Sequence, residues 1–301
     1  MPDSECKTLI TVDELRIARP APVVFDCRHR LSDPGYGHAA YLEAHIPGAR
    51  FAHLDANLSG TVIPGRTGRH PLPDVAEFTE FLRAAGVSNS SQLVAYDDAG
   101  GAIAARFWWL LRWLGHDYVA VLDGGFQAWI AAGEQVDSGT PADAARGSFE
   151  PDIRDTMIVT ADTILAGLGV STPETPPALV LMDARAHDRF DGTNETIDPV
   201  AGHIPGAVSV PFAGNLDDRG FFRSAAELQN RYANAISAVP GSAGNDVAGV
   251  GPRVATYCGS GVTAAHNVLA MVHAGLPEPA LYAGSWSEWI ADGERPVDVQ
   301  G

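Results

Sequence analysis

Short runs of apolar and β-branched residues recur along the chain, and each is bounded by polar or turn-forming residues. Two lie in the first half, Val23–Asp26 and Leu93–Asp97, and two in the second half, Leu179–Asp183 and Val254–Cys258. Runs of this length are typical of strands that are buried on both faces of a parallel sheet. The pattern therefore predicts parallel β-structure in both halves of the chain.

A helical pattern follows the second run of each half, after a turn that contains glycine. The apolar positions of these two patterns are Phe107, Trp108, Leu110, Leu111 and Leu114 in the first half and Val268, Leu269, Val272 and Leu276 in the second. Alternation of strand, loop and helix implies a mostly parallel sheet flanked by helices. The predicted fold class is α/β.

The two halves of the chain repeat one another. Four blocks recur in the same order: VVFDCR ending at Arg28 and LVLMDAR ending at Arg185, AHIPGA from Ala44 and GHIPGA from Gly202, the run from Leu93 and the run from Val254, and VLDGGFQAW from Val121 and LYAGSWSEW from Leu281. The offset between partners stays between 157 and 161 residues, which is far too long for a solenoid repeat. We therefore predict two tandem domains, over residues 7–134 and 158–299, joined by a linker over residues 135–157. A further glycine-rich stretch, Pro240–Pro252, predicts a mobile loop.

Composition narrows the classes of function. The chain has 301 residues, of which 46% are hydrophobic and 19% charged, a balance typical of globular proteins. Its net charge is -17 and it has no run of basic residues, so we expect binding neither to nucleic acid nor to an anionic membrane. No apolar stretch approaches the length of a membrane span, and the first residues do not resemble a signal peptide. We expect a cytoplasmic protein.

The three cysteines, Cys6, Cys27 and Cys258, form neither a CxxC motif nor a cluster with zinc-ligand spacing. A sparse, odd set of cysteines favours a reducing compartment. The sequence accordingly predicts neither a metal site nor a cofactor. Cys6 is expected to be a bystander near the terminus, and Cys27, inside a predicted strand segment, a small buried apolar residue.

Cys258 differs from the other two because of its position. It closes a predicted strand and precedes the loop Gly259–Ala264 and a helix that begins near Thr263. Ligands of open α/β sheets bind beyond the carboxyl ends of the strands. Gly259 and Gly261 allow several backbone N–H groups to face one point, and the helix adds the positive end of its dipole. Both effects favour a thiolate, so Cys258 is the candidate nucleophile.

The first copy provides an internal comparison, because Asp97 aligns with Cys258. A carboxylate cannot hold sulfane sulfur, and its charge would repel an anionic substrate. The first domain is therefore expected to be catalytically silent.

In its repeated blocks and in the loop after Cys258, the chain resembles the tandem rhodanese family, which comprises thiosulfate and 3-mercaptopyruvate sulfurtransferases. The resemblance covers nearly the whole chain and rests on the DCR and DAR blocks, the two HIPGA blocks, the segment GSWSEW (Gly284–Trp289) and the loop CGSGVTA (Cys258–Ala264). The loop is similar to that of the mercaptopyruvate branch, whereas the thiosulfate branch has basic residues after the cysteine. The resemblance implies two rhodanese-like domains and transfer of sulfane sulfur through a persulfide on Cys258.

The resemblance also implies roles for other residues. Arg189, which follows the DAR block in an Arg-Phe dipeptide, matches an arginine that binds the substrate carboxylate, while Arg28 and Arg185 are expected to form structural ion pairs. Ser260, His70 and Asp55 match a Ser-His-Asp relay, in which His70 and Asp55 come from the first domain. The loop residues Gly259, Gly261, Val262 and Thr263 are expected to bind substrate. The implied partners are a small sulfur donor and a thiol or cyanide acceptor, with thioredoxin among the thiols.

One position departs from the mercaptopyruvate pattern. A second substrate arginine is expected nine residues after Arg189, and this chain has Asp198 there. The loop itself carries no Lys or Arg from Cys258 to Gly275, which disfavours the dianion thiosulfate. The sequence therefore predicts 3-mercaptopyruvate as the donor, with thiosulfate as the alternative.

Two other classes of protein share features with this sequence. A cysteine phosphatase shares the strand–loop–helix design, but it needs an arginine six residues after the cysteine to hold phosphate, and Ala264 stands there. A non-catalytic rhodanese module used for binding would fit a chain that lacks the cysteine in both copies. This chain retains Cys258 in the second copy, which favours an enzyme.

Overall fold

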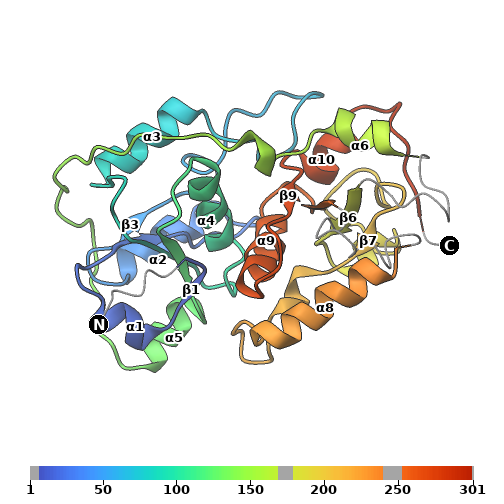
Figure 1. Ribbon diagram of the computed structural model, residues 1–301. Coiled ribbons are helices and arrows are strands. Elements are labelled where there is room, and N and C mark those ends of the chain that lie inside the picture. Colours follow the sequence, from blue (N-terminus) through green and yellow to red (C-terminus); the bar gives the residue numbers. More distant parts are fainter. Residues whose placement is uncertain (1–6, 169–178, 240–252, 300–301) are drawn as a thin grey trace. The chain divides into compact units, whose positions relative to one another are not determined.

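The computed structural model describes residues 7–168, 179–239 and 253–299, and these residues form two compact units. Unit 1 contains the described residues up to Thr61, Leu72–Asp155 and Asp217–Phe222; unit 2 contains Val62–Pro71 and the described parts of Thr156–Leu216 and Arg223–Gly301. Each unit is a parallel sheet flanked by helices, which confirms the predicted α/β fold class (Figure 1). Cys6 and the predicted mobile loop Pro240–Pro252 lie outside the described residues.

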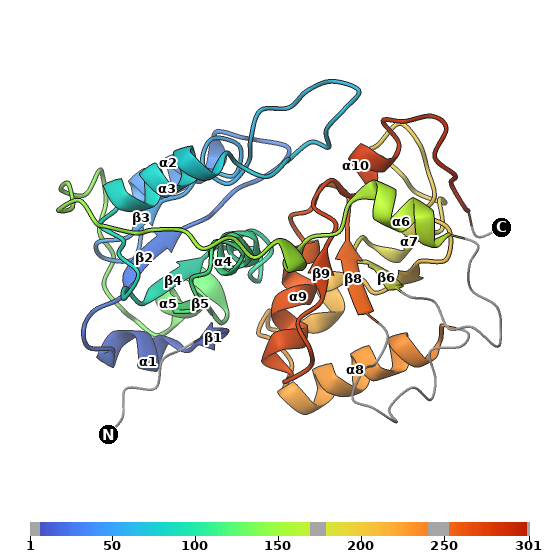
Figure 2. The same ribbon diagram turned by 45° about the horizontal axis from the view of Figure 1, so that its top comes forward.

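Unit 1 has a five-stranded parallel sheet with the order β1-β5-β4-β2-β3. Its strands are β1 (Leu9–Ile10), β2 (Val23–Asp26), β3 (Arg50–Phe51), β4 (Leu93–Tyr96) and β5 (Val119–Leu122), and its helices are α1 (Val12–Ile17), α2 (Tyr36–Glu43), α3 (Val75–Ala84), α4 (Ala104–Trp113) and α5 (Gly125–Ala131). The sheet is covered on both faces. Phe25 of β2 packs against Phe81 of α3 and Phe107 of α4, whereas Leu15 of α1 and Trp129 of α5 belong to the other core cluster. Figure 2 shows α1 and α3 on opposite sides of this sheet.

Unit 2 has a four-stranded parallel sheet with the order β7-β6-β8-β9. Its elements are the strands β6 (Leu179–Asp183), β7 (Val208–Ser209), β8 (Arg253–Tyr257) and β9 (Ala280–Leu281), the 3-10 helices η1 (Asp155–Met157, which begins in unit 1) and η2 (Phe212–Asn215), and the helices α6 (Ala161–Gly167), α7 (His187–Phe190), α8 (Ala225–Ser237), α9 (Ala264–His273) and α10 (Ser285–Trp289). Ile158 adds a bridge to Leu281 of β9, so the edge of this sheet is extended as β1 extends the sheet of unit 1.

Helices also cover both faces of the unit 2 sheet. On one face, side chains of α6, α7 and α10 share a core with Leu181 and Tyr257. On the other, α8 and α9 lie side by side (Figure 1). The buried hydroxyl group of Tyr232 in α8 donates to the side-chain oxygen of Asn267 in α9, 3.1 Å away. The loop that carries Cys258 leads directly into α9, so the packing of this helix on α8 helps to position the loop.

The repeated sequence blocks form the same network in each unit. Arg28 and Arg185 are buried and paired with Asp26 and Asp183, respectively, at 2.6 Å, which confirms that they are structural ion pairs. Each arginine also donates through Nη2 to a backbone carbonyl next to the HIPGA histidine, at Ala44 in unit 1 and Gly202 in unit 2. The DCR/DAR and HIPGA blocks therefore recur in both units because the arginine of the first block joins the end of the strand to the backbone of the turn in the second block.

The segment that follows the first domain packs on unit 1. Asp137 forms a bridge with His45, Phe149 is fully buried, and Arg154 pairs with Asp117 at 2.7 Å. Unit 1 accordingly extends to Asp155, within the stretch 135–157 that the sequence analysis designates a linker.

The segment Val62–Pro71 comes from the first half of the sequence but belongs to unit 2. Its backbone approaches the start of α10 closely, since a Cβ atom on Gly68 would lie 2.4 Å from the carbonyl oxygen of Gly284. The N–H of Arg69 donates to Oγ of Ser287, 3.1 Å away. This segment brings His70 to the loop that carries Cys258.

Candidate active site

Cys258 lies directly beyond the carboxyl end of β8. The strand ends at Tyr257, one residue before the expected position, and the cysteine begins the loop. Its side chain is buried, and Sγ accepts a hydrogen bond from the N–H of Gly261 at 3.2 Å. Its own N–H donates to Oγ of Ser285 at 3.0 Å, and its carbonyl oxygen accepts from the N–H of Trp286 at 2.9 Å. The start of α10 thus holds the backbone of Cys258 on both sides.

Gly261 permits the close turn of this loop. Its φ is +80°, a conformation that side-chain-bearing residues rarely adopt, and a Cβ atom there would lie 2.2 Å from the carbonyl oxygen of Ala283. Thr263 precedes α9, whose N-terminal end adds a positive partial charge near the loop. One backbone N–H, that of Gly261, points at the sulfur, and the role of Cys258 as a thiolate nucleophile stays a prediction.

The corresponding loop of unit 1 shows what this loop type binds. The buried carboxylate of Asp97 accepts four backbone hydrogen bonds, all at 2.8 Å, from Ala99, Gly101, Ile103 and Ala104. Burial raises the pKa of Asp97, and the four N–H donors offset part of that rise. The side chain occupies the anion position of its own loop, which gives the predicted catalytic silence of the first domain a physical basis.

Ser285 supports the nucleophile from a strained backbone position. It is buried, its φ is 54°, and its hydroxyl group donates to the carbonyl oxygen of Tyr282 while accepting the N–H of Cys258. In unit 1 the equivalent position is Gly125, with a φ of 58°. Serine therefore tolerates a glycine conformation because its hydroxyl group satisfies a buried donor.

Replacing Ser285 by Ala is expected to lower the free energy of unfolding by about 1–3 kcal/mol, because the buried N–H of Cys258 loses its acceptor while the strain remains. Ser285→Gly should be the milder change, since glycine adopts a positive φ without penalty. Denaturant unfolding of both variants measures the difference. An alanine variant as stable as the unmodified protein would show that this hydrogen bond contributes nothing.

Ser260 and His70 contact each other as the sequence analysis expects, although His70 belongs to unit 2 and not to the first domain. Nδ1 of His70 lies 2.7 Å from Oγ of Ser260, and both side chains are buried. When this nitrogen is unprotonated, the hydroxyl group of Ser260 donates to it. The pair is adjacent to Cys258 in the loop and has the geometry of a proton relay.

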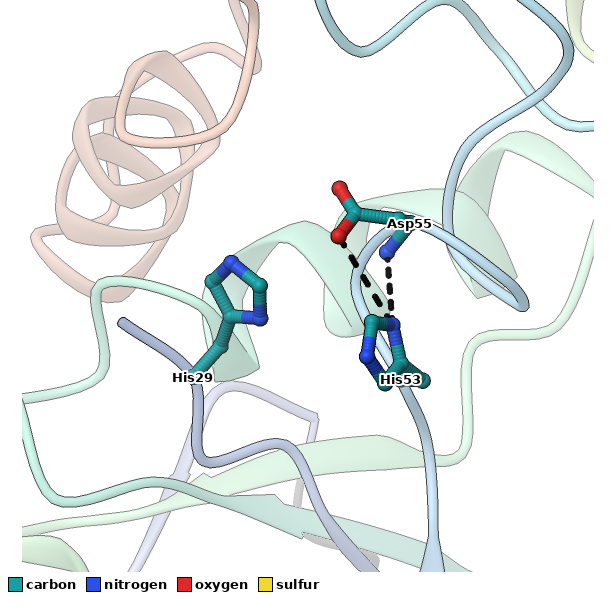
Figure 3. A group of neighbouring side chains, drawn as sticks. All are labelled: His29, His53 and Asp55. Carbon is teal, nitrogen blue, oxygen red and sulfur yellow. Dashed lines mark hydrogen bonds and ion pairs between the residues drawn. The ribbon is translucent and has the colours of Figure 1, made fainter. Parts of the chain in front are cut away.

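Asp55, the third predicted relay residue, lies in unit 1. Figure 3 shows it beside His53, whose Nδ1 is 3.9 Å from a carboxylate oxygen of Asp55 and accepts the N–H of Asp55 at 3.1 Å. The structure thus gives Asp55 a partner of its own, and its part in the relay stays a prediction.

The same group could hold a metal ion. Potential ligand atoms of His29, His53 and Asp55 lie within 4.8 Å of one another, and the two imidazole rings face each other edge to face (Figure 3). Burial lowers the pKa of His29, which favours the neutral ring. However, Nδ1 of His53 already accepts backbone hydrogen bonds, and its Nε2 is 3.3 Å from the carbonyl oxygen of Pro34. A metal would have to displace the latter contact, and the predicted absence of a metal stays a prediction.

Arg189, the predicted carboxylate-binding residue, projects from the short helix α7. Its Nε donates to Glu195 at 3.0 Å, and its Nη2 donates to Asp198 at 2.9 Å. Burial would raise the pKa of Glu195, but hydrogen bonds from Arg189 and from the N–H groups of Asp198 and Ile197 hold it below its ordinary value. Asp198, at the position where the family pattern has an arginine, is therefore a partner of Arg189.

Arg69 is a site residue that the sequence analysis missed. An ideal Cβ atom on Gly259 would lie 2.9 Å from Nη2 of Arg69 and 3.6 Å from both terminal nitrogens of Arg189. Two guanidinium groups therefore flank the residue next to Cys258, although the loop itself has no cation. One signal in the sequence could have identified it: Arg69 directly precedes His70, and His70 was already a candidate site residue.

Cys27 contrasts with Cys258. It is fully buried, and burial together with the negative charges of Asp26 and Asp97 raises the pKa of its thiol well above the ordinary value. A neutral, inaccessible thiol is a poor nucleophile. Its interpretation as a small buried apolar residue agrees with this environment.

Comparison with known proteins places both halves of the chain in one group. The family described as "Rhodanese-like domain" matches residues 11–132 and 171–292. A Pseudomonas aeruginosa protein named as a 3-mercaptopyruvate sulfurtransferase is 47% identical over 292 residues, which cover 96% of this chain and 97% of that protein. A Mycobacterium tuberculosis protein named as a thiosulfate sulfurtransferase is 40% identical over 297 residues, 97% of this chain and 96% of that protein.

Solved structures show the same likeness. A 3-mercaptopyruvate sulfurtransferase from Leishmania major superimposes with a TM-score of 0.78 at 33% identity, covering 94% of this chain and 74% of that one. A 3-mercaptopyruvate sulfurtransferase from Escherichia coli superimposes with a TM-score of 0.73 at 29% identity, covering 94% of this chain and 100% of that one. The architecture and the sequence relatives agree.

Proposed function

Because the chain belongs to the rhodanese-like family, in two tandem copies, we propose that it is a 3-mercaptopyruvate sulfurtransferase in which Cys258 carries the transferred sulfur. The observation that supports this most is the setting of Cys258: a buried sulfur that accepts a backbone N–H, in a loop beside two guanidinium groups and a Ser-His pair. The relatives named as 3-mercaptopyruvate sulfurtransferases support the same donor.

The proposed reaction has two steps. In the first, the thiolate of Cys258 attacks the sulfur of 3-mercaptopyruvate, so that an S–S bond forms and the bond from carbon 3 to sulfur breaks. The electron pair of that bond passes to the substrate as an enolate, which takes up a proton and leaves as pyruvate. In the second, an acceptor thiol or cyanide attacks the outer sulfur and releases the Cys258 thiolate.

Ser260 and His70 would serve proton transfer in the first step. The enolate needs a proton, and a hydroxyl group hydrogen-bonded to an imidazole can deliver one at neutral pH. The distance of 2.7 Å between the two side chains supports this role. Asp55 would complete the relay as a residue that orients or stabilises the charged imidazole. The N–H groups of the loop Gly259, Gly261, Val262 and Thr263 would bind the developing negative charge.

The charge balance of the site favours a singly charged donor. Arg69 and Arg189 supply two positive charges, and Glu195 and Asp198 supply two negative ones. A monoanion adds one negative charge to this balanced set, whereas a dianion such as thiosulfate adds two next to the sulfur. Thiosulfate is the second candidate donor, favoured by the two guanidinium groups beside Gly259 and by the name of the relative from M. tuberculosis.

A comparison of donors tests the proposal. With cyanide as acceptor, kcat/KM is expected to be higher for 3-mercaptopyruvate than for thiosulfate. Arg189→Ala should lower kcat/KM for 3-mercaptopyruvate by about 10- to 100-fold, chiefly through KM, because one charge-assisted hydrogen bond to the carboxylate is lost. Steady-state rates for both donors measure the effect. A higher kcat/KM for thiosulfate in the unmodified protein would refute the choice of donor but leave the persulfide on Cys258 in place.

We infer the acceptor and the cellular location from the chemistry of the proposed persulfide. Thiols such as thioredoxin would receive sulfur from Cys258, and free thiols of that kind require a reducing compartment. The two cysteines within the described residues are unpaired, which is consistent with a cytoplasmic enzyme. None of the helices within the described ranges has the length and hydropathy needed to cross a membrane.

A further inference from the structure

Two histidines and a carboxylate meet at the carboxyl edge of the unit 1 sheet. His29 follows the end of β2, and His53 and Asp55 follow the end of β3, which is the neighbouring strand. The carboxyl ends of parallel strands lie at the same edge of a sheet, so the two loops come together. Figure 3 shows the three side chains around one space, and potential ligand atoms of all three lie within 4.8 Å of one another.

The shared fold does not require these residues, as the second copy shows. The last residue of β2 pairs with the last residue of β3, and in unit 2 the last residue of β6 pairs with the last residue of β7. Counted from these pairs, unit 2 has Ala186, Pro211 and Ala213 at the three positions. None of these side chains can bind a cation, and the parallel sheet forms without them. The group is therefore a property of unit 1 and not of the fold that both units share.

His29 has a buried ring whose nitrogens lack a protein partner. It is 6% exposed, and within the ranges that the structure describes its ring forms no hydrogen bond. Buried polar side chains nearly always have a hydrogen-bond partner, so an exception indicates a place for a water molecule or an ion. Burial lowers the pKa of His29 and so favours the neutral imidazole, which is the form that binds a metal ion.

His53 and Asp55 leave the space accessible and give it negative charge. Their side chains are 24% and 48% exposed, and Nδ1 of His53 lies 3.9 Å from Oδ2 of Asp55. The charge of Asp55 partly offsets the effect of burial on the pKa of His29, so its field reaches that ring. A cation can therefore enter from solvent, and one carboxylate is present to balance part of its charge.

Binding requires the ring of His53 to release contacts with the backbone. Its Nε2 lies 3.3 Å from the carbonyl oxygen of Pro34, and its Nδ1 accepts the N–H groups of Asp55 and Ala56 at 3.1 and 3.4 Å. Two of these three distances exceed the usual range of a hydrogen bond, so the contacts are weak. Asp55 and Ala56 are exposed, so water can replace the ring as the acceptor of their N–H groups.

From this arrangement we infer that His29, His53 and Asp55 bind one divalent transition-metal ion of the zinc class. Two neutral imidazoles and a carboxylate suit Zn²⁺ and similar ions, whereas Mg²⁺ and Ca²⁺ prefer oxygen ligands. Three protein ligands leave the fourth position of a tetrahedral ion to water. Spacing along the chain does not predict this site, because its ligands come from two loops that the sheet brings together.

Zinc titration of chelator-treated Cys258→Ser protein tests the inference, because this variant lacks the loop cysteine, whose sulfur can itself bind zinc. Isothermal titration calorimetry at neutral pH is expected to show one site. His29→Phe in this background keeps a ring but removes both nitrogens. It should weaken binding by more than about 100-fold, since residues that merely contact a metal ligand already contribute about 10- to 100-fold. His38→Phe, the same substitution at an exposed position of unit 1, should leave the dissociation constant unchanged.

Thermal unfolding provides a second readout, because an ion that binds only the folded protein raises the unfolding temperature. This temperature should rise with Zn²⁺ in the Cys258→Ser protein and in its His38→Phe derivative, and stay unchanged in the His29→Phe derivative. Mg²⁺ should have no effect on any of the three. The site is refuted if the Cys258→Ser protein binds no zinc. It is also refuted if the His29→Phe derivative is folded by circular dichroism and binds zinc as tightly as its parent, which would be adventitious binding by other imidazoles.

Asp55→Asn tests the third ligand. The amide keeps an oxygen atom but loses the charge, so one zinc ion should still bind, with a larger dissociation constant. An unchanged constant would show that the carboxylate is not a ligand and would overturn the three-residue site. None of these measurements uses turnover, so a failure of the metal site leaves the proposed sulfur transfer intact, and a failure of the proposed donor leaves the metal site intact.

Discussion

Cys258→Ser is expected to abolish sulfur transfer, with a loss of at least about 1000-fold in kcat for either donor, because a serine hydroxyl group is a poor nucleophile and cannot form the S–S bond of the persulfide. The fold should persist, since serine is close in volume and its oxygen can accept the N–H of Gly261 as the sulfur does at 3.2 Å. Mass spectrometry after incubation with 3-mercaptopyruvate should show a gain of one sulfur atom on the unmodified protein and none on the variant.

Cys27→Ser is the matched control, because Cys27 is buried in unit 1 with a thiol whose pKa burial raises. This variant should keep the persulfide mass shift and a normal kcat, although a buried hydroxyl group lowers its stability. Alkylation at neutral pH should modify Cys258 before Cys27. Turnover by Cys258→Ser at the normal rate would refute the assignment of the nucleophile.

The fold was predictable from the sequence because its signals are local and occur twice. The four apolar runs became β2, β4, β6 and β8, with ends that shifted by at most one residue, as is usual for element boundaries. The recurrence of the DCR/DAR and HIPGA blocks reports a buried ion pair that closes each strand end, a contact over a short sequence separation. Because the domain is duplicated, each of the four repeated blocks provides the same structural signal twice.

The site was predictable only where it lies within one loop. The role of Cys258 follows from its position after a strand and before α9, which sequence spacing encodes directly. The contacts of Arg69 with Asp198 and of His70 with Ser260 join residues that lie 129 and 190 positions apart. No periodicity encodes such pairs, so His70 came from a family resemblance and Arg69 was overlooked. From the sequence alone, Asp198 indicates that the second arginine of the family pattern is missing. In the structure, Asp198 pairs with another arginine, Arg69.

Gly261→Ala is expected to have the second-largest effect, on stability and on activity together. The new Cβ atom would lie 2.2 Å from the carbonyl oxygen of Ala283, which is backbone and cannot rotate away. The φ of +80° adds strain of about 1–2 kcal/mol, and relief of the overlap about 1–3 kcal/mol more. The free energy of unfolding should fall by about 2–5 kcal/mol. Because the N–H of Gly261 donates to Sγ of Cys258, any shift that relieves the overlap also moves this donor away from the sulfur.

Gly206→Ala separates the two causes. Gly206 also lies in unit 2 and has a φ of +77°, but a Cβ atom there would meet no atom within 4 Å. Its replacement should therefore cost only the conformational part, about 1–2 kcal/mol, and leave kcat unchanged. Denaturant unfolding and kcat with 3-mercaptopyruvate should be measured for both variants. If Gly261→Ala were no less stable and no less active than Gly206→Ala, the close approach of Gly261 to Ala283 would not be what shapes the sulfur-binding loop.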